Sequence, residues 1–263
     1  MKLVRAELLK LFTTRLWWIM LLVVLLYLSI SLGAVIGFAG VSPEEGAPPV
    51  FPARDTPAFQ RLAWGQAVTG SIIVAILGAT MVTTEYRYQT ITTTLLTTPR
   101  RERVVAAKLG AGVLVGLLFG VAILLLFALG IIPAVLLSGG ELHLLDEGVP
   151  RVIGGGLAAL ALYTLLGIGV GSLMRNQIAA IVSLAVWIYV IEQLVNAIPL
   201  LQPIGRWTPQ GAASALTNPG IDPGSMIDLG YLLPAWAGAL LLLGYALLFG
   251  LLASLTTLRR DIT

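Results

Sequence analysis

Six stretches of this 263-residue chain are apolar enough, and long enough, to cross a lipid bilayer as helices. They cover residues 17–38, 62–83, 104–136, 152–174, 178–200 and 231–258. A helix needs roughly 20 apolar residues to span about 30 Å of hydrocarbon, because its backbone groups find no water there. The third run exceeds one crossing, and we expect it to project beyond the membrane at Lys108 and to bend near Pro133. The sequence therefore predicts an all-α integral membrane protein with six transmembrane helices.

Composition supports this class and excludes others. Hydrophobic residues make up 57% of the chain and charged residues 11%, whereas soluble domains carry roughly 25% charged residues. A disordered chain would need the opposite balance. The chain has no cysteine, so disulfides, thiol nucleophiles and cysteine-based metal sites are excluded. The net charge of +3 is a weak indication of nucleic-acid binding in so apolar a chain, and we expect no nucleic-acid partner.

The distribution of lysine and arginine predicts the orientation of the six spans. With the N-terminus inside, twelve basic residues fall on cytoplasmic segments and four on outer ones, and such an excess marks the cytoplasmic side. Both termini are therefore expected in the cytoplasm. The cytoplasmic set is Lys2, Arg5, Lys10, Arg15, Arg87, Arg100, Arg101, Arg103, Lys108, Arg175, Arg259 and Arg260, and the outer set is Arg54, Arg61, Arg151 and Arg206.

Residues 1–16 are too polar to cross the membrane but have an amphipathic pattern. On a helical wheel Val4, Leu8, Leu11 and Phe12 share one face, while the polar side carries Lys2, Lys10 and Thr13. Such a helix lies in the membrane interface with its cations toward anionic lipid. We expect Arg5, Glu7 and Lys10 to mark this interfacial helix. A positively charged flank that only sets topology is the alternative.

The remaining chain, residues 17–263, is expected to form one six-span transmembrane domain with two notable connections. Residues 201–230 hold prolines and glycines on both sides of a short helix-forming stretch, 209–216. They are expected to form an extracellular cap or a re-entrant segment, with a plain surface loop as the alternative. The inner connection 84–108 contains a threonine-rich centre, a proline and several arginines. These cations either enforce topology or dock a soluble partner.

The sequence lacks the groups that an enzyme of a common class would need. No GxxxxGK[ST] phosphate-binding loop surrounds Lys2, Lys10 or Lys108, so ATP cannot be bound by that route. The single histidine, His143, lies in an acidic outer loop, where a lone imidazole is usually solvated. We therefore expect no catalytic residues, no metal site and no cofactor bound by this chain.

Glu192 is the one ionisable residue deep within an apolar run. It lies roughly 21 Å along the fifth helix at about 1.5 Å per residue. A carboxylate in hydrocarbon is costly and must face protein or water. It either lines a translocation path or forms a polar contact between helices together with Gln193 and Asn196. Glycines repeat every fourth position at 33/37, 112/116/120 and 167/171, which favours close helix packing.

The segment 83–109, TTEYRYQTITTTLLTTPRRERVVAAKL, resembles the loop between the second and third spans of ATP-binding-cassette (ABC) exporter permeases of the type-2 class. The bacterial family shows E-[YF]-R-x-G-T-I, then L-L-x-T-P-x-R, then a lysine that opens the third span. Gln89 stands where that family usually has glycine. The positions that match are Glu85, Arg87, Thr90, Ile91, Pro99, Arg101 and Lys108.

The resemblance implies a permease subunit of an ABC exporter in the bacterial cytoplasmic membrane. Its ATPase site, with ATP and magnesium, would lie on a separate nucleotide-binding subunit. A second permease copy, identical or paralogous, would complete the pathway within the lipid bilayer. The loop 84–108 would contain the coupling helix. The residues expected to couple to the ATPase are Glu85, Arg87, Thr90, Pro99, Arg100, Arg101, Arg103 and Lys108.

The cargo and the competing functions follow from the same residues. The scarcity of charges within the spans favours a hydrophobic or amphipathic cargo such as a drug, a peptide or a lipid-like molecule. The alternatives are an ion- or proton-coupled secondary transporter and a non-transporting structural membrane subunit. A secondary transporter would be expected to carry internal repeats and more intramembrane ionisable groups.

Overall fold

The computed structural model is entirely helical in the part of the chain that it describes, apart from one isolated bridge between Ala39 and Phe51. It describes residues 2–44, 47, 49–90, 101–145, 148–174, 176–218 and 232–256. Six helical segments are long and apolar enough to span a membrane, which confirms the expected number. They are Leu16–Gly37, Pro57–Arg87, Arg103–Leu137, Val149–Met174, Gln177–Ala197 and Ala235–Ala253.

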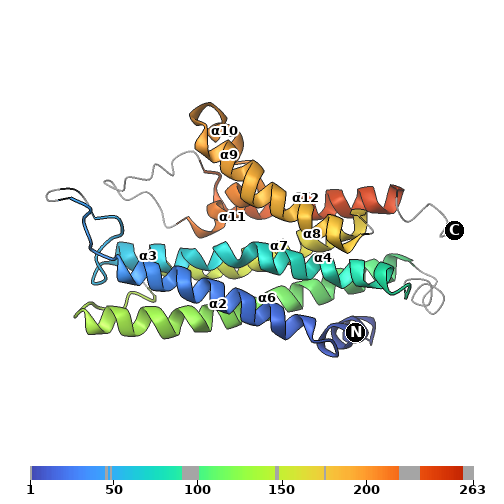
Figure 1. Ribbon diagram of the computed structural model, residues 1–263, viewed down its shortest axis with the longest axis horizontal. Coiled ribbons are helices and arrows are strands. Elements are labelled where there is room, and N and C mark those ends of the chain that lie inside the picture. The colour runs from blue at the N-terminus through green and yellow to red at the C-terminus, as the bar shows by residue number, and fades with distance from the viewer. Residues whose placement is uncertain are drawn as a thin grey trace.

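The helices follow one another along the chain as an up-and-down bundle (Figure 1). Their bounds are α1 Lys2–Phe12, α2 Leu16–Gly37, α3 Pro57–Gly65, η1 Gln66–Gly70, α4 Ser71–Arg87, α6 Arg101–Leu137, α7 Val149–Met174, α8 Gln177–Val186, η2 Trp187–Ile191, α9 Glu192–Ala197, η3 Pro199–Leu201, α10 Gln202–Gly205, α11 Pro209–Thr217 and α12 Ala235–Thr256. The end of α12 lies at the same end of the bundle as α1 (Figure 1), as an even number of spans requires.

Two spans depart from regular α-helix in their middle. The second span is α3, the 3₁₀ segment η1 and α4 in sequence, and the fifth is α8, the π-helical segment η2 and α9. Such departures occur most often at hinges and functional sites. The third span, α6, instead continues through Pro133 without a break. Proline removes one backbone donor and favours a kink at that point.

α7 is the central helix of the bundle. It packs against α4, α6, α11 and α12, and most of its length from Ala159 to Gly171 is buried. α2 contributes one stripe at four-residue spacing, Val24, Leu28 and Leu32, to the core. Its opposite face, with Leu22, Leu26 and Ile30, is exposed. Apolar side chains on both the buried and the exposed face are expected of a helix that lies between the core of a bundle and lipid.

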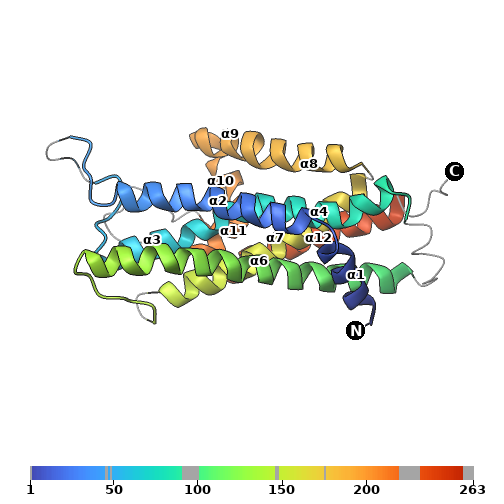
Figure 2. The ribbon, with the colours of Figure 1, turned by 60° about the horizontal axis from the view of Figure 1, so that its bottom comes forward.

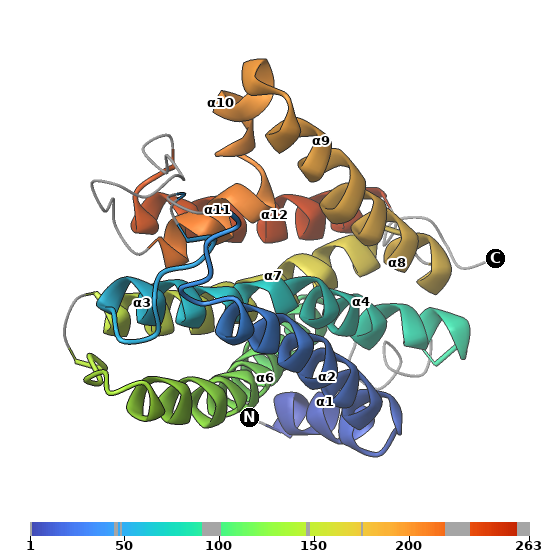
Figure 3. The ribbon, with the colours of Figure 1, turned by 60° about the vertical axis from the view of Figure 1, so that its left-hand side comes forward.

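α8 and α9 diverge from the other helices, so that the fifth span leans away from the bundle (Figure 1 and Figure 3) and lies apart from α2 and α4 in the view of Figure 2. Its outward face is apolar and includes Ile178, Val182, Val186 and Leu194. The helix ends at Ala197, three residues before the end of the apolar run. The φ of Ile198 is −98° and its ψ 113°, an extended conformation of the kind that a following proline favours.

The segment after the fifth span turns back into the bundle. α11 covers the expected helical stretch, and Ala212, Ala213 and Leu216 on it are buried between α7 and α12. Pro209 opens the helix, and the Thr208 hydroxyl accepts a hydrogen bond from Gly211 N at 3.1 Å. This is a standard helix start. α11 thus lies inside the bundle, packed against α7 and α12.

Glycines allow α4 and α7 to pack closely against each other. A β-carbon on Gly167 would overlap the carbonyl of Ala75, and one on Gly171 would overlap Ala79. On α4, a β-carbon at Gly78 would overlap the carbonyl of Thr164. The stripe at positions 167 and 171 therefore serves helix packing within this chain. Gly33, by contrast, has nothing within 4 Å of its β-carbon position.

We expect Gly167→Ala to destabilise the protein by about 1–3 kcal/mol, because overpacking forces α4 and α7 apart. Gly33→Ala is the matched control and should keep or slightly raise stability, since alanine favours the helix more than glycine does. Unfolding of both variants in detergent, followed by tryptophan fluorescence, measures the difference. Equal stability of Gly167→Ala and the wild type would contradict the packing argument.

Candidate functional site

Four charged side chains from three helices meet in one cluster. Glu7 and Lys10 come from α1, Glu85 from the end of α4 and Lys108 from α6. Lys10 Nζ lies 2.7 Å from Glu7 Oε1 and 2.7 Å from Glu85 Oε1. Lys108 Nζ lies 2.7 Å from Glu7 Oε2 and 2.9 Å from Glu85 Oε1. We call Glu7, Lys10, Glu85 and Lys108 the ion-pair cluster.

Burial makes the ion-pair cluster different from an ordinary surface salt bridge. Glu7, Glu85 and Lys108 are 7%, 5% and 5% exposed, whereas the Lys10 side chain reaches solvent. Buried charges are costly to desolvate unless each has a partner in good geometry. Two carboxylates and two ammonium groups balance each other here. The cluster therefore holds α1, α4 and α6 in one relative position, and removal of one member leaves a buried charge without compensation.

The pKa shifts of the two α1 residues agree with this arrangement. Burial opposes ionisation of Glu7, but Lys108 and Lys10 outweigh it, so that the pKa of Glu7 lies below its ordinary value. Burial likewise opposes the charge of Lys10, and the hydrogen bonds to Glu7 and Glu85 outweigh it and raise the pKa of Lys10. The Glu7 contribution is lost only as the pH falls through its lowered pKa, and that of Lys10 only as the pH rises through its raised pKa. Glu7 and Lys10 thus stay ionised across neutral pH.

One oxygen of the cluster is not used. Glu85 Oε2 is buried and accepts no hydrogen bond within the described part of the chain. A cavity of about 430 Å³ lies beside it, between the cluster and the start of α8. Its lining includes Glu85, Lys10, Arg87 and Gln177. A buried carboxylate oxygen without a donor among the described residues is unusual.

The expected coupling residues fall into three groups. Glu85 and Lys108 join the ion-pair cluster, while Arg87 Nη1 donates to Gln177 Oε1 at 3.1 Å and so links α4 to α8. Arg5 and Arg103 are exposed on α1 and α6. Pro99 and Arg100 lie outside the described residues, and only the backbone place of Arg101, at the start of α6, is described. The meeting of Glu7 with Lys108 was missed by the sequence reasoning, since 101 positions separate them.

The turn after α4 explains the departure at Gln89 from the glycine of the resembling family. Thr90 N donates to Glu85 O at 2.9 Å and Gln89 N to Tyr86 O at 3.3 Å, the pair of bonds that ends a helix in a Schellman motif. Gln89 takes the left-handed position of this motif with φ of 56°. Glycine is the residue that adopts this conformation at no steric cost. Gln89 thus occupies a glycine position in a turn that keeps the same geometry.

Glu192, Gln193 and Asn196 lie on neighbouring turns but face different surroundings. The Glu192 carboxylate is fully buried, accepts a hydrogen bond from Trp187 Nε1 at 2.8 Å and another from Gln210 N at 3.2 Å. It therefore joins the π-helical segment to the first turn of α11. Gln193 lines a separate cavity, and Asn196 O accepts from Gln202 at 3.4 Å. Glu192 thus contacts α11, whereas Gln193 faces the cavity.

His143 takes part in a structural contact on the opposite end of the bundle. The buried amide of Gln60 accepts a hydrogen bond from His143 N at 2.9 Å and donates to Glu141 O at 2.7 Å. This contact attaches the loop that follows α6 to α3. Among the described residues no group of three or more histidine, aspartate or glutamate side chains is placed to hold a metal ion.

The six spans, the short helix α1 and the ion-pair cluster at its contact with α4 and α6 define a multi-pass membrane protein of the permease type. The family comparison agrees with this class. The model of the ABC-2 family transporter protein matches residues 3–192, and the chain belongs to that family. It is a transmembrane permease subunit, and members of the family generally pair with an ABC ATPase. No curated protein matches the chain.

We expect Lys108→Met to destabilise the protein by about 3–5 kcal/mol, because Glu7 and Glu85 would keep their buried charges with one partner fewer. Arg103→Met on the same helix is the control and should change stability by about 0.5 kcal/mol or less. Adding Glu7→Gln to Lys108→Met should recover part of the loss, since it removes one of the two carboxylates. Thermal unfolding in detergent tests the set, and a Lys108→Met protein as stable as Arg103→Met would refute the role of the cluster.

Gln89→Gly should keep stability or raise it by up to about 1 kcal/mol, because glycine relieves the left-handed backbone but loses more entropy on folding. Gln89→Val should instead lower stability by about 1–2 kcal/mol, since a β-branched residue fits this conformation poorly. The midpoints of thermal unfolding of the two variants test this difference in stability. A glycine variant less stable than the valine variant would show that the Gln89 side chain, and not its backbone, matters.

Proposed function

We propose that this chain is the membrane half of an ABC exporter in the bacterial cytoplasmic membrane, driven by ATP hydrolysis on a separate subunit. Two permease copies, identical or paralogous, would sit on two ATPase subunits and enclose the pathway for a hydrophobic or amphipathic cargo. Membership of the ABC-2 family supports the pairing with an ATPase. The absence of a phosphate-binding loop from these 263 residues agrees with it.

The observation that carries the proposal is the ion-pair cluster. It joins the two ends of the 84–108 connection, since Glu85 lies at the start of that segment and Lys108 at its end. It also holds α1 through Glu7 and Lys10. A force applied to the loop by an ATPase would therefore reach α1, α4 and α6 together. In this proposal the cluster makes the docking loop and two spans move as one unit.

The distribution of basic residues indicates which end of the bundle faces the cytoplasm. The end that carries the ion-pair cluster also carries Arg5, Arg87 and Arg103, and the excess of basic residues on such segments favours the cytoplasm. Both termini would then be cytoplasmic. α1 would lie along the inner interface, with its basic residues toward headgroups.

The docking surface for the ATPase would consist of the exposed basic residues around this end and the free acceptor of Glu85. Arg87, Arg100, Arg101 and Arg103 supply positive charge within one short stretch of sequence. Glu85 Oε2 supplies a buried acceptor beside a cavity. An acidic ATPase surface with one projecting donor would complement both features.

We expect the double change Arg101→Glu and Arg103→Glu to reduce ATPase co-purification at least about tenfold, because like charges would face each other at the interface. Arg151→Glu is the matched control, an exposed arginine in the first turn of α7 at the other end. The measurement is the amount of co-expressed ATPase recovered through a tag on the permease. If only Arg151→Glu abolishes ATPase recovery, the opposite end of the bundle faces the ATPase. If neither change has an effect, the proposed docking surface is wrong.

A further inference from the structure

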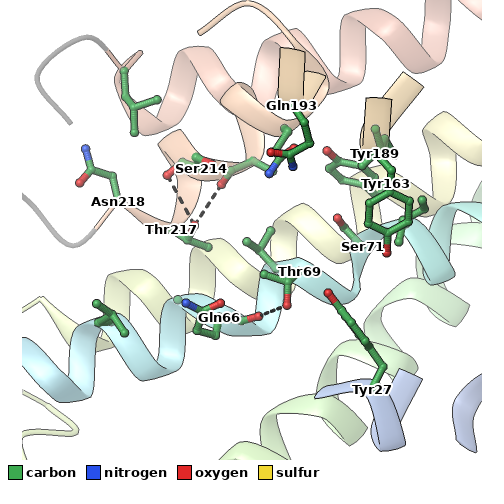
Figure 4. A pocket seen from close by; sticks show the side chains of 18 of the residues that line it. Tyr27, Gln66, Thr69, Ser71, Tyr163, Tyr189, Gln193, Ser214, Thr217 and Asn218 are labelled. Atoms are coloured by element: carbon green, nitrogen blue, oxygen red, sulfur yellow. Dashed lines mark hydrogen bonds between the residues drawn. The ribbon is translucent and has the colours of Figure 1, made fainter. Parts of the chain in front are cut away.

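A cavity of about 380 Å³ that is lined by apolar surface and by several hydroxyl and amide side chains lies between the helices, apart from the ion-pair cluster. It is bounded by α2, η1, α7, η2 and α11, and Figure 4 shows the polar side chains that these elements direct toward it. Its volume is within the range of small-molecule sites, roughly 300–1,000 Å³. The hydroxyl and amide side chains that line it are Tyr27, Gln66, Thr69, Ser71, Tyr163, Tyr189, Gln193, Gln210, Ser214, Thr217 and Asn218.

Both departures from regular α-helix in the spans border this cavity. Gln66, Val68 and Thr69 come from the 3₁₀ segment η1, and Ile188 and Tyr189 from the π-helical segment η2. The re-entrant helix α11 forms a third wall. Irregular backbone and polar side chains at membrane depth are tolerated where they line a cavity. Their convergence on one cavity points to a binding role rather than to packing.

The charge of the lining restricts the ligand. Among the described lining residues Arg61 is the only lysine, arginine, aspartate or glutamate, and it already has an interaction partner in the chain. The nearby Glu192 does not line the cavity, since its carboxylate is taken by Trp187 and Gln210 N. A cation would meet Arg61 without a counter-charge. An anion would have to share Arg61 with its present partner, although the buried Nε of this side chain has no hydrogen-bond partner among the described residues. Both charged classes would therefore be desolvated without full compensation.

The shape of the lining suits an amphipathic molecule. The rings of Tyr27, Tyr163 and Tyr189 approach the cavity from three different elements (Figure 4), and aromatic side chains offer apolar faces beside a polar tip. Leu62, Ile72 and other aliphatic side chains complete the apolar part of the surface. The amides and hydroxyls can both donate and accept hydrogen bonds. Uncharged oxygen-rich groups use this combination best.

We propose that this cavity binds an uncharged amphipathic molecule whose head carries hydroxyl or amide groups. Its identity as cargo rests on the proposed exporter function, whereas binding itself does not. The head would exchange hydrogen bonds with the side chains of η1, α9 and α11, and the apolar part would lie against the tyrosine rings and aliphatic residues. Gln193 and Thr69 would contact the head from opposite walls.

Three photoreactive probes test the proposal on the purified permease in lipid nanodiscs. All carry the same diazirine-bearing decyl chain, and their heads are glycerol, sulfate and trimethylammonium. We expect the glycerol probe to label residues of η1, η2 or α11 most strongly, as read by peptide mass spectrometry. If either charged probe labels these segments as strongly, or if the glycerol probe labels only the lipid-facing helices, the proposal is wrong.

Two variants and a matched control locate the head. Gln193→Leu and Thr69→Val should each weaken labelling by the glycerol probe roughly threefold to tenfold, the effect of one hydrogen bond. Gln202→Leu makes the same chemical change on α10, outside the cavity, and should leave labelling unchanged. If neither lining variant differs from Gln202→Leu, the head does not bind here. The comparison of probes on the wild type stands even if a variant does not fold.

The assay uses the permease alone, so its failure and the failure of the exporter proposal are distinguishable. A permease that recovers its ATPase but shows no cavity labelling retains the proposed function and loses the ligand class. A permease that shows selective labelling but never recovers an ATPase retains the binding site and loses the exporter assignment.

Discussion

The close packing of α7 against α4 is the contact on which the rest of the architecture depends. Backbone carbonyls of each helix occupy the space that side chains would need on the other, at Gly78, Gly167 and Gly171. Lipid exerts no hydrophobic force between helices, so such contacts supply much of the association energy in a membrane. With α4 fixed on α7, η1 is held at the cavity and Glu85 is held at the opposite end of the same span. One helix contact thus sets the position of both sites.

The last turn and the 3₁₀ segment of the second span differ in their electrostatics. At its last turn the protein buries full charges and balances them within a cluster drawn from three helices. At η1 the side chains are uncharged, Glu192 is turned toward α11, and Arg61 is the one charged side chain among the described residues that line the cavity. A balanced cluster resists being pulled apart, because separation exposes uncompensated charge. Neutral dipoles can exchange partners at a lower cost. The ion-pair cluster therefore suits a contact that must hold helices together, and the neutral side chains at η1 suit a site that must release what it binds.

Much of the fold could be predicted from the sequence, because each span carries its own signal. Apolar run length located six spans, and the break signals around 209–216 located α11. The ion-pair cluster and the cavity could be predicted less well. Glu7 lies near Leu11 on the buried side of α1, a position that the wheel of apolar residues did not assign to it, and its pairing with Lys108 depends on how α1 crosses α6. The π-helical segment η2 has no local sequence signal, since it arises where Glu192 and Trp187 meet α11.

The length of α6 has a mechanical consequence. Its 37 residues form a rod of about 55 Å at about 1.5 Å per residue, well beyond the roughly 30 Å of hydrocarbon. Lys108 holds this helix near its first turns, so that a tilt about this contact moves the far end most. Leu137 at that end lies about 44 Å from Lys108 at about 1.5 Å per residue, and a tilt of about 5° would move it by about 4 Å. A small change of angle at the ion-pair cluster would thus become a displacement of several ångströms on the other side of the bilayer without any change in the helix itself.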